Sequence, residues 1–181
     1  MDKNALIVID VQNYFFSPES GAYIRNSERV LRNINKVIEY FSVKERLIIF
    51  TKFISPKSKT ANMRKKWKHM PSLKEREFAE KLILSENYIL INKESYSSFE
   101  KTKLLRILRK NKIERIFFTG VMTHLCVEST VRDSFEKGFS STIIKDCCKS
   151  SSPEFHRSAI KIMKHGFSDI VTVKDIINEK V

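Results

Sequence analysis

ALIVID, the stretch at residues 5–10, is the part of the sequence that decides the fold class. It is a short apolar run, rich in β-branched residues and ending in an aspartate, and it is too short for a helix. A continuous apolar run of this length fits a strand that is buried on both faces, which is typical of parallel sheets. Runs of the same kind recur at residues 47–51, 88–91, 116–119, 142–144 and 170–173.

Amphipathic segments separate the predicted strands. Apolar residues recur at helical spacing at residues 30–41, 78–83, 104–108 and 127–135, and a further helix is predicted at 153–166. Ser72 and Glu75 have the spacing of a capping box, which predicts the start of the second helix. Ser151 with Glu154, or Ser152 before Pro153, fits the start of the last one. This alternation implies right-handed crossovers and an open parallel sheet with helices on both faces, whose ligands bind at the carboxyl ends of the strands.

The composition indicates one ordinary globular domain that spans residues 1–181. The chain is 41% hydrophobic and 30% charged, which excludes a disordered protein. No apolar run approaches the roughly 20 residues of a membrane span, so no membrane partner is expected. The first residues lack the features of a signal peptide. Three cysteines, two of them adjacent, do not form a disulfide framework, so we expect a reduced, cytoplasmic compartment.

The charge of the chain is strongly positive. Lys and Arg number 34 against 21 Asp and Glu, which gives a formal net charge of +13. Such a charge suits a nucleic-acid-binding module, but no sequence motif of such a module is present. The basic residues are spread over the whole chain, and solvated helix faces account for most of them. Nucleic acid is therefore not the expected partner, although residues 46–74 form a distinct basic stretch that contains no acidic residue.

Three reactive side chains follow predicted strands. Asp10 ends the first strand, Lys93 follows the third, and Cys126 comes six residues after Gly120, which follows the fourth. If the strand order reverses beside the first strand, the three side chains meet in one crevice. A thiol, a carboxylate and an ammonium would then supply a nucleophile, a base and an electrostatic partner. Each residue also has an ordinary alternative, because Asp turns chains, Lys reaches solvent and free Cys is commonly a small buried hydrophobe.

The segment GVMTHLC, residues 120–126, carries the most specific signal. Gly120 permits a tight turn or the close approach of a ligand. Thr123 is a good N-cap, and this places Cys126 in the first turn of the following helix. The positive end of a helix lowers the pKa of a thiol, and its free N–H groups can hold an oxyanion. Position alone leaves the choice between a reactive and a merely buried Cys126 open.

Three motifs resemble those of the isochorismatase-like cysteine hydrolases. They are D-x-Q at residues 10–12, K-x-x-Y-S-x-F at residues 93–99 and G-V-x-T-x-x-C-V at residues 120–127. The resemblance runs from about residue 5 to residue 173, which is nearly the whole chain. It implies a three-layer α/β/α fold in which a six-stranded parallel sheet has the strand order 3-2-1-4-5-6.

The resemblance also implies roles for the residues of these motifs. Asp10 is then the general base, Lys93 the residue that pairs with it, and Cys126 the nucleophile. The peptide bond between Val121 and Met122 corresponds to a cis bond, and the backbone N–H groups of Met122 and Cys126 form an oxyanion hole. Lys93 and the helix end are expected to favour the thiolate. No cofactor is implied, and a homodimer or higher homo-oligomer is expected because family members usually assemble in this way.

The branches of this family differ in chemistry. Its nicotinamidases carry a metal site, D-x-H with further His residues after the second strand. Residues 51–70 contain no Asp and only His69, so no metal site is expected and nicotinamidase activity is disfavoured. Isochorismatase cleaves a vinyl ether, which needs acid–base help but no thiol nucleophile. Cys126 therefore favours metal-independent hydrolysis of a C–N bond in an amide or carbamoyl compound, with vinyl-ether hydrolysis as the alternative.

Several residues are candidates for contact with a small-molecule substrate. The candidates are Gln12, Phe15, Trp67, Thr123 and His124. Simple packing is the alternative explanation for these side chains. The basic stretch, residues 46–74, follows the second strand, so it can overhang the crevice at the strand ends. Its lysines can attract an anionic substrate and steer it inward.

Overall fold

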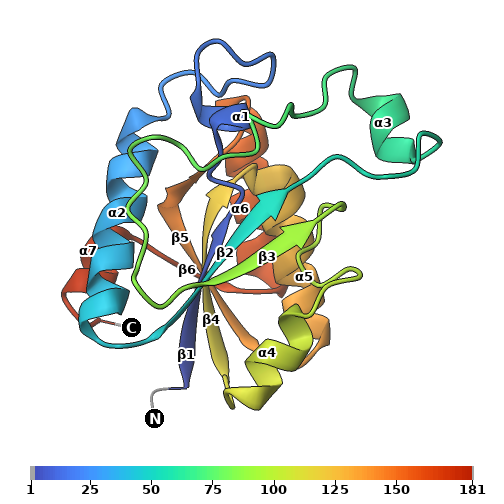
Figure 1. Ribbon diagram of the computed structural model, residues 1–181. Helices are drawn as coiled ribbons and strands as arrows, with labels where there is room; N and C mark the ends of the chain where they lie inside the picture. Colours follow the sequence, from blue (N-terminus) through green and yellow to red (C-terminus); the bar gives the residue numbers. More distant parts are fainter. Residues whose placement is uncertain (1–2, 181) are drawn as a thin grey trace.

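The computed structural model describes residues 3–180, which build a six-stranded sheet whose strands are all parallel. The strands are β1 (Asn4–Ile9), β2 (Leu47–Phe53), β3 (Ile89–Lys93), β4 (Arg115–Val121), β5 (Ser140–Lys149) and β6 (Asp169–Val171). Their order across the sheet is β3-β2-β1-β4-β5-β6, so β1 lies in the middle, between β2 and β4 (Figure 1). This order confirms the predicted fold and the reversal of strand order beside β1.

Helices cover both faces of the sheet and complete the predicted three-layer α/β/α arrangement. The helices are α1 (Asn13–Phe16), α2 (Glu28–Val43), α3 (Asn62–Lys66), α4 (Leu104–Lys110), α5 (Glu128–Glu136), α6 (Pro153–Gly166) and α7 (Val173–Ile177), with the π-helical turn η1 (Thr123–Val127) before α5. Helices α2 and α7 pack on one face, and α4, α5 and α6 pack on the other (Figure 1). Within the described part of the chain, no helix is long and apolar enough to cross a membrane.

The alternation of side chains along β1 explains why its sequence is apolar throughout. Ala5, Ile7 and Ile9 belong to the core on the side of α4, α5 and α6, whereas Leu6 and Val8 belong to the core on the side of α2. All five side chains are fully buried. A strand that is covered on both faces has no solvent-facing position for a polar residue.

The predicted helix after Ser72 is wrong. Ser72 and Glu75 do form the reciprocal hydrogen bonds of a capping box, with the Ser72 N–H donating to Glu75 over 2.8 Å and the Glu75 N–H donating to the Ser72 hydroxyl over 3.3 Å. The chain then continues as turns, because its backbone pairs with the segment after β1 instead. Tyr14 N–H donates to the Glu75 carbonyl over 2.9 Å, and Phe78 forms an antiparallel bridge with Gln12.

The other predicted elements are present, with shifted ends. The strand β5 extends to Lys149, well beyond the predicted residues 142–144, and β3 includes Lys93 as its last residue. The predicted start of α6 is confirmed, because the Ser152 hydroxyl accepts a hydrogen bond from the backbone N–H of Phe155 and Pro153 is the first helical residue.

Candidate active site

Asp10 directly follows β1 at the carboxyl edge of the sheet, next to β2. Its φ of 53° is left-handed, a conformation that Asp adopts more readily than most residues. The Thr51 hydroxyl donates to Asp10 Oδ1 over 2.6 Å, and the Asp10 N–H lies 3.2 Å from the same hydroxyl oxygen. The side chain of Asp10 is fully buried. A neighbouring strand therefore fixes both the backbone and one carboxylate oxygen of Asp10.

Lys93 brings a positive charge into this interior site from β3. Its Nζ lies 2.6 Å from Asp10 Oδ2, with both side chains fully buried, and it donates a hydrogen bond to the Ser95 carbonyl over 3.0 Å. Burial lowers the pKa of Lys93, but the charge and hydrogen bond of the Asp10 carboxylate raise that pKa, the net direction is upward, and Lys93 stays an ammonium. The attraction between the buried ammonium and the buried carboxylate offsets part of the cost of removing both charges from water. Either charge alone would lack that compensation.

Cys126 faces the Asp10–Lys93 pair from η1, the π-helical turn that follows β4. Burial is the largest effect on its thiol and raises its pKa; Lys93 lowers that pKa and Asp10 raises it, and the net value is about 12. Lys93 favours the thiolate, as expected, because it lowers the pKa of Cys126, but burial and Asp10 outweigh it, so the resting Cys126 is a thiol at neutral pH. The structure thus brings the three predicted side chains together, with the sulfur in its thiol form.

The turn that carries Cys126 has two predicted features, of which one is confirmed. The peptide bond between Val121 and Met122 is cis, as the resemblance implied. Thr123 was expected to cap the helix, but the residue that precedes η1 is Met122, and the Thr123 side chain makes no capping bond. Its hydroxyl instead lies 2.9 Å from Nδ1 of His156 in α6, because the turn packs against that helix.

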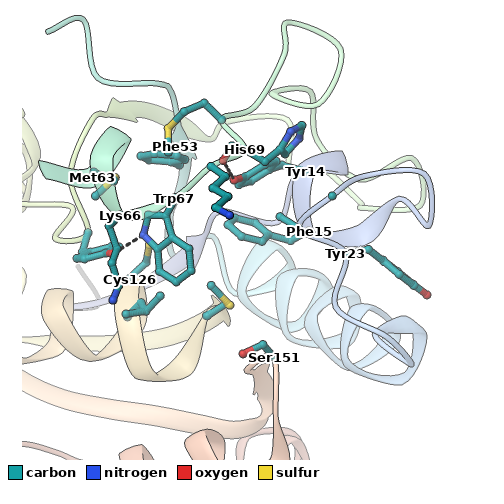
Figure 2. Close-up of a pocket in the computed structure, with 17 residues that line it drawn as sticks. Tyr14, Phe15, Tyr23, Phe53, Met63, Lys66, Trp67, His69, Cys126 and Ser151 are labelled. Atoms are coloured by element: carbon teal, nitrogen blue, oxygen red, sulfur yellow. Dashed lines mark hydrogen bonds between the residues drawn. The ribbon is translucent and has the colours of Figure 1, made fainter. Parts of the chain in front are cut away.

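A cavity of about 520 Å³ opens beside Cys126. Of the predicted substrate contacts, Phe15 and Trp67 line it, together with Met122 and Cys126, the two residues of the predicted oxyanion hole. Lys66 and Lys68 of the basic stretch and Tyr96 of the K-x-x-Y-S-x-F motif also line it, and the lining residues that the sequence did not single out include Tyr14, Phe53 and Met63. Figure 2 shows the labelled rings of Phe15, Phe53 and Trp67 directed into a common hollow, with Tyr23 at its outer edge. The volume lies in the range of small-molecule sites.

Trp67 closes one side of this cavity and is held there by Tyr96. The Trp67 Nε1–H donates to the Tyr96 hydroxyl over 2.6 Å (Figure 2). Tyr96 comes from the loop after β3, and Trp67 comes from the end of α3 in the basic stretch. The tyrosine of the K-x-x-Y-S-x-F motif was a visible signal for this contact, but its partner could not be identified without the structure.

Three predicted pocket residues are not among those that line the cavity. Gln12 is fully buried, and its side-chain amide donates to the carbonyls of Phe53 and Arg76 over 3.1 and 2.9 Å. Thr123 is occupied by the bond to α6 described above. The ring of His124 stacks on Phe155, with the ring centroids 4.6 Å apart. These side chains hold the frame of the site together.

The family model described as "Isochorismatase domain" matches residues 4–175. This chain belongs to that family. Its fold is similar to that of a cysteine hydrolase from Pseudomonas syringae pv. phaseolicola 1448A, with a TM-score of 0.90 and 21% identity over 98% of this chain and 93% of that chain. The match confirms the family resemblance that the three sequence motifs indicated.

Two further solved structures are similar to this isochorismatase-family chain. An isochorismatase-like hydrolase from Alkaliphilus metalliredigens has a TM-score of 0.86 and 21% identity, over 99% of this chain and 100% of that chain. A pyrazinamidase of Pyrococcus horikoshii in complex with zinc has a TM-score of 0.83 and 29% identity, over 94% of this chain and 99% of that chain. The similarity thus extends over the full sheet and its flanking helices.

The zinc of that pyrazinamidase raises the question whether this chain could hold a metal ion. Among residues 3–180, no three His, Cys, Asp or Glu side chains are grouped closely enough to do so. His69 lines the cavity, but its Nε2 lies 2.9 Å from Glu75 Oε1, and its ring stacks on Tyr14 with the centroids 5.5 Å apart. The residues present do not fit a zinc site, and the reaction proposed below has no step through one.

Proposed function

We propose that this protein hydrolyses a C–N bond of a small amide or carbamoyl compound through a thioester on Cys126. The observation that carries the proposal is the buried ion pair of Asp10 and Lys93, 2.6 Å apart, against the Cys126 thiol at a cavity wall. A nucleophile, a base and a fixed counter-charge at the edge of a cavity are the elements that covalent acyl transfer requires.

Acylation begins with a thiol, because the pKa of Cys126 is about 12 in the resting site. Asp10 takes the proton from Sγ as the sulfur attacks the carbonyl carbon of the substrate. The negative charge moves to the carbonyl oxygen, where the backbone N–H groups of Met122 and Cys126 stabilise it. The C–N bond then breaks, the proton on Asp10 passes to the departing nitrogen, and ammonia or an amine leaves. Lys93 compensates the charge of the Asp10 carboxylate before and after this transfer.

Deacylation uses the same base with water as the nucleophile. Asp10 takes a proton from water as the water oxygen attacks the thioester carbon, and the same two N–H groups hold the second oxyanion. The C–S bond breaks, the sulfur regains its proton from Asp10, and the acid product is released. The starting site, with thiol, carboxylate and ammonium, is thereby restored.

Hydrolysis of a C–N bond is favoured over vinyl-ether cleavage by two observations. Cys126 borders the cavity, where a thiol has a direct use as a nucleophile, whereas vinyl-ether cleavage needs only acid–base groups. The similarity to the pyrazinamidase of Pyrococcus horikoshii, at 29% identity, supports the same choice because its name denotes an amidase.

The test is a screen of small amides, ureas and carbamoyl compounds, with ammonia release as the readout. We expect turnover that Cys126→Ala lowers by ~10³-fold or more. The matched control is Cys147→Ala, which removes a buried thiol from the α2 side of the sheet and is expected to keep the activity. Amide turnover that survives Cys126→Ala would contradict the thioester. Isochorismate should be included, because its turnover by Cys126→Ala protein would support the vinyl-ether alternative.

A further inference from the structure

The wall of the cavity beside Cys126 is rich in aromatic rings. Its aromatic rings are those of Tyr14, Phe15, Tyr23, Phe53, Trp67, His69 and Tyr96. Tyr14 contacts its neighbours closely, with its ring centroid 4.6 Å from that of Phe15. The hydrogen bond to Tyr96 orients the face of Trp67 at the opposite wall. Flat apolar faces on several sides of a small cavity favour a planar ring, which can stack on them or meet them edge to face.

The mouth of the cavity is positively charged. Lys66 and Lys68 flank Trp67 and line the cavity, and both are exposed. No Asp or Glu of residues 3–180 is among the lining side chains. Glu75, whose carboxylate contacts the lining residue His69, is engaged with that ring and with the backbone of Ser72. An anion at the mouth would thus meet two ammonium groups without an opposing carboxylate.

The inner end of the cavity has the opposite preference. Cys126 lies there with Asp10 behind it, and the ammonium of Lys93 is already paired with that carboxylate. A second anion at this depth would be repelled by Asp10 and would find no free counter-charge, at a place from which water is largely excluded. A neutral amide or carbamoyl group suits the inner end, and a charged group suits the mouth.

We infer that the substrate carries an aromatic ring and a carboxylate in addition to the scissile group. The ring lies between Trp67 and the rings of Tyr14 and Phe15, the neutral amide or carbamoyl group is at Cys126, and the carboxylate is at Lys66 and Lys68. Only the placement of the scissile group rests on the proposed function. The ring and the carboxylate follow from the walls and the mouth of the cavity themselves.

Binding tests this inference without turnover, because Trp67 is the single tryptophan of the chain and its fluorescence reports on the cavity alone. In a Cys126→Ala background, Trp67 emission is titrated with 4-carbamoylbenzoate, with its neutral isostere terephthalamide and with the aliphatic succinamate. We expect 4-carbamoylbenzoate to bind at least ~10-fold more tightly than either of the others. Its advantage over terephthalamide should shrink as the salt concentration rises from about 0.02 to 0.5 M.

Matched lysine variants locate the charge that is responsible. The double variant Lys66→Gln with Lys68→Gln should weaken 4-carbamoylbenzoate by about tenfold and leave terephthalamide unchanged. The control is Lys65→Gln, an exposed lysine of α3 that does not line the cavity, and it should change neither ligand. Equal affinity for the charged and neutral ligands, equal effects of the double variant and of Lys65→Gln, or binding of succinamate as tight as that of 4-carbamoylbenzoate would overturn the inference.

These outcomes are separate from those of the proposed function. If amides are hydrolysed through Cys126 with no preference for an aromatic carboxylate, the proposed function stands and the inference is wrong. If 4-carbamoylbenzoate binds as expected but no amide or carbamoyl compound is turned over, the inferred ring and carboxylate sites stand and the proposed reaction is wrong.

Discussion

At the scale of single residues, the Cys126 thiol is the least ordinary group of the site. Many reactive cysteines owe their reactivity to a lowered pKa, whereas burial and the Asp10 carboxylate raise the pKa of Cys126 to about 12. The resting site therefore holds Cys126 as a thiol and Asp10 as a carboxylate. In the proposed reaction the proton passes from Cys126 to Asp10 only when a substrate carbonyl is in place. In this arrangement the sulfur is protected from chance alkylation between turnovers.

This arrangement predicts an unusual pH dependence for alkylation of Cys126 by iodoacetamide. The thiolate is the reactive form, and below the pKa its fraction grows tenfold per pH unit, so the rate should keep rising from pH 8 to pH 11. A typical thiol would level off near its pKa of about 8.5. Mass spectrometry of the Cys126 peptide gives the rate at each pH. A plateau below pH 9 would contradict the raised pKa.

The variant Asp10→Asn should have opposite effects on the reactivity of the Cys126 thiol and on hydrolysis of the substrate. The Asp10 charge and its hydrogen bond raise the pKa of Cys126, so their removal lowers that pKa. A decrease of one unit gives ~10-fold faster alkylation at pH 8. Hydrolysis of amides should nevertheless be lost, since no base remains to transfer protons to the leaving nitrogen. The same protein would thus be more reactive with iodoacetamide and inactive with substrate; slower alkylation or retained turnover would contradict the assigned role of Asp10.

The residue scale also shows what the sequence could predict about the site. Asp10, Lys93 and Cys126 could be selected because each ends or follows an apolar strand, and parallel strands bring such residues to one edge. Gln12 could not be assigned in this way, because its amide bonds to the carbonyls of Phe53 and Arg76, which are remote in sequence. The raised pKa of Cys126 could not be predicted from the sequence either, since it depends on how deeply η1 is buried.

At the scale of elements, strands were predicted well and the segment between β2 and β3 was not. A strand that is buried on both faces has an apolar pattern that needs no knowledge of its partners, as in β1 and β4. The segment after Ser72 has a genuine capping box but no helix, because Tyr14 and Gln12 offer its backbone other hydrogen-bond and bridge partners. Local signals predict local contacts correctly, and tertiary pairing decides whether an element continues.

The contact between α3 and the loop after β3 leads to a prediction about substrate binding. Tyr96→Phe removes the hydroxyl that accepts the hydrogen bond from Trp67 and leaves the ring in place. The Trp67 wall then loses its fixed orientation, so KM should rise by ~3–10-fold, in line with the loss of about 1 kcal/mol for one hydrogen bond, with a smaller change in kcat. Trp67 emission should shift and its anisotropy should fall, which a general loss of stability would not produce in the folded state.

The matched control for Tyr96→Phe is Tyr88→Phe. Tyr88 packs against Phe50 and Phe78 on the opposite side of the sheet, with its ring centroid 5.1 Å from that of Phe50, and it does not line the cavity. The same loss of a hydroxyl there should leave KM and Trp67 emission unchanged. Equal kinetic effects of the two variants would show that the bond between Tyr96 and Trp67 has no part in positioning the cavity wall.

At the scale of the whole molecule, the net charge of +13 divides into two parts with different consequences. The exposed lysines and arginines of α4, such as Arg106 and Lys110, lie away from the cavity and form a solvated face. Lys66 and Lys68 lie at its mouth. The total charge attracts anions toward the molecule over about a Debye length, which is about 10 Å at 0.1 M salt. Lys66 and Lys68 are the cations that an attracted anion meets at the cavity.

The site also depends on how closely the two central strands approach one another. Gly120 in β4 pairs with Ile9 in β1, directly before Asp10, and it has a φ of +112°. A methyl group at Gly120 would overlap the Ile9 carbonyl oxygen and lie 2.7 Å from the Ile9 nitrogen, so only glycine fits there without moving a strand. Because β1 carries Asp10 and β4 leads into Cys126, the same gap sets the separation between base and nucleophile.

Gly120→Ala should therefore be the most damaging of three equivalent substitutions. We expect it to lower the free energy of unfolding by about 3 kcal/mol or more, since backbone atoms of two central strands would have to move apart. Gly138→Ala meets no atom within 4 Å but keeps a φ of +80°, so it should cost about 1 kcal/mol. Gly166→Ala, with open space in the last turn of α6, should be neutral or slightly stabilising. Urea unfolding measures the free energy of unfolding of the three variants and so tests this order. If Gly120→Ala does not fold, the yields of soluble protein are compared instead. A Gly120→Ala protein as stable as Gly138→Ala would mean that the central strands can separate, and that their close approach does not hold Asp10 and Cys126 together.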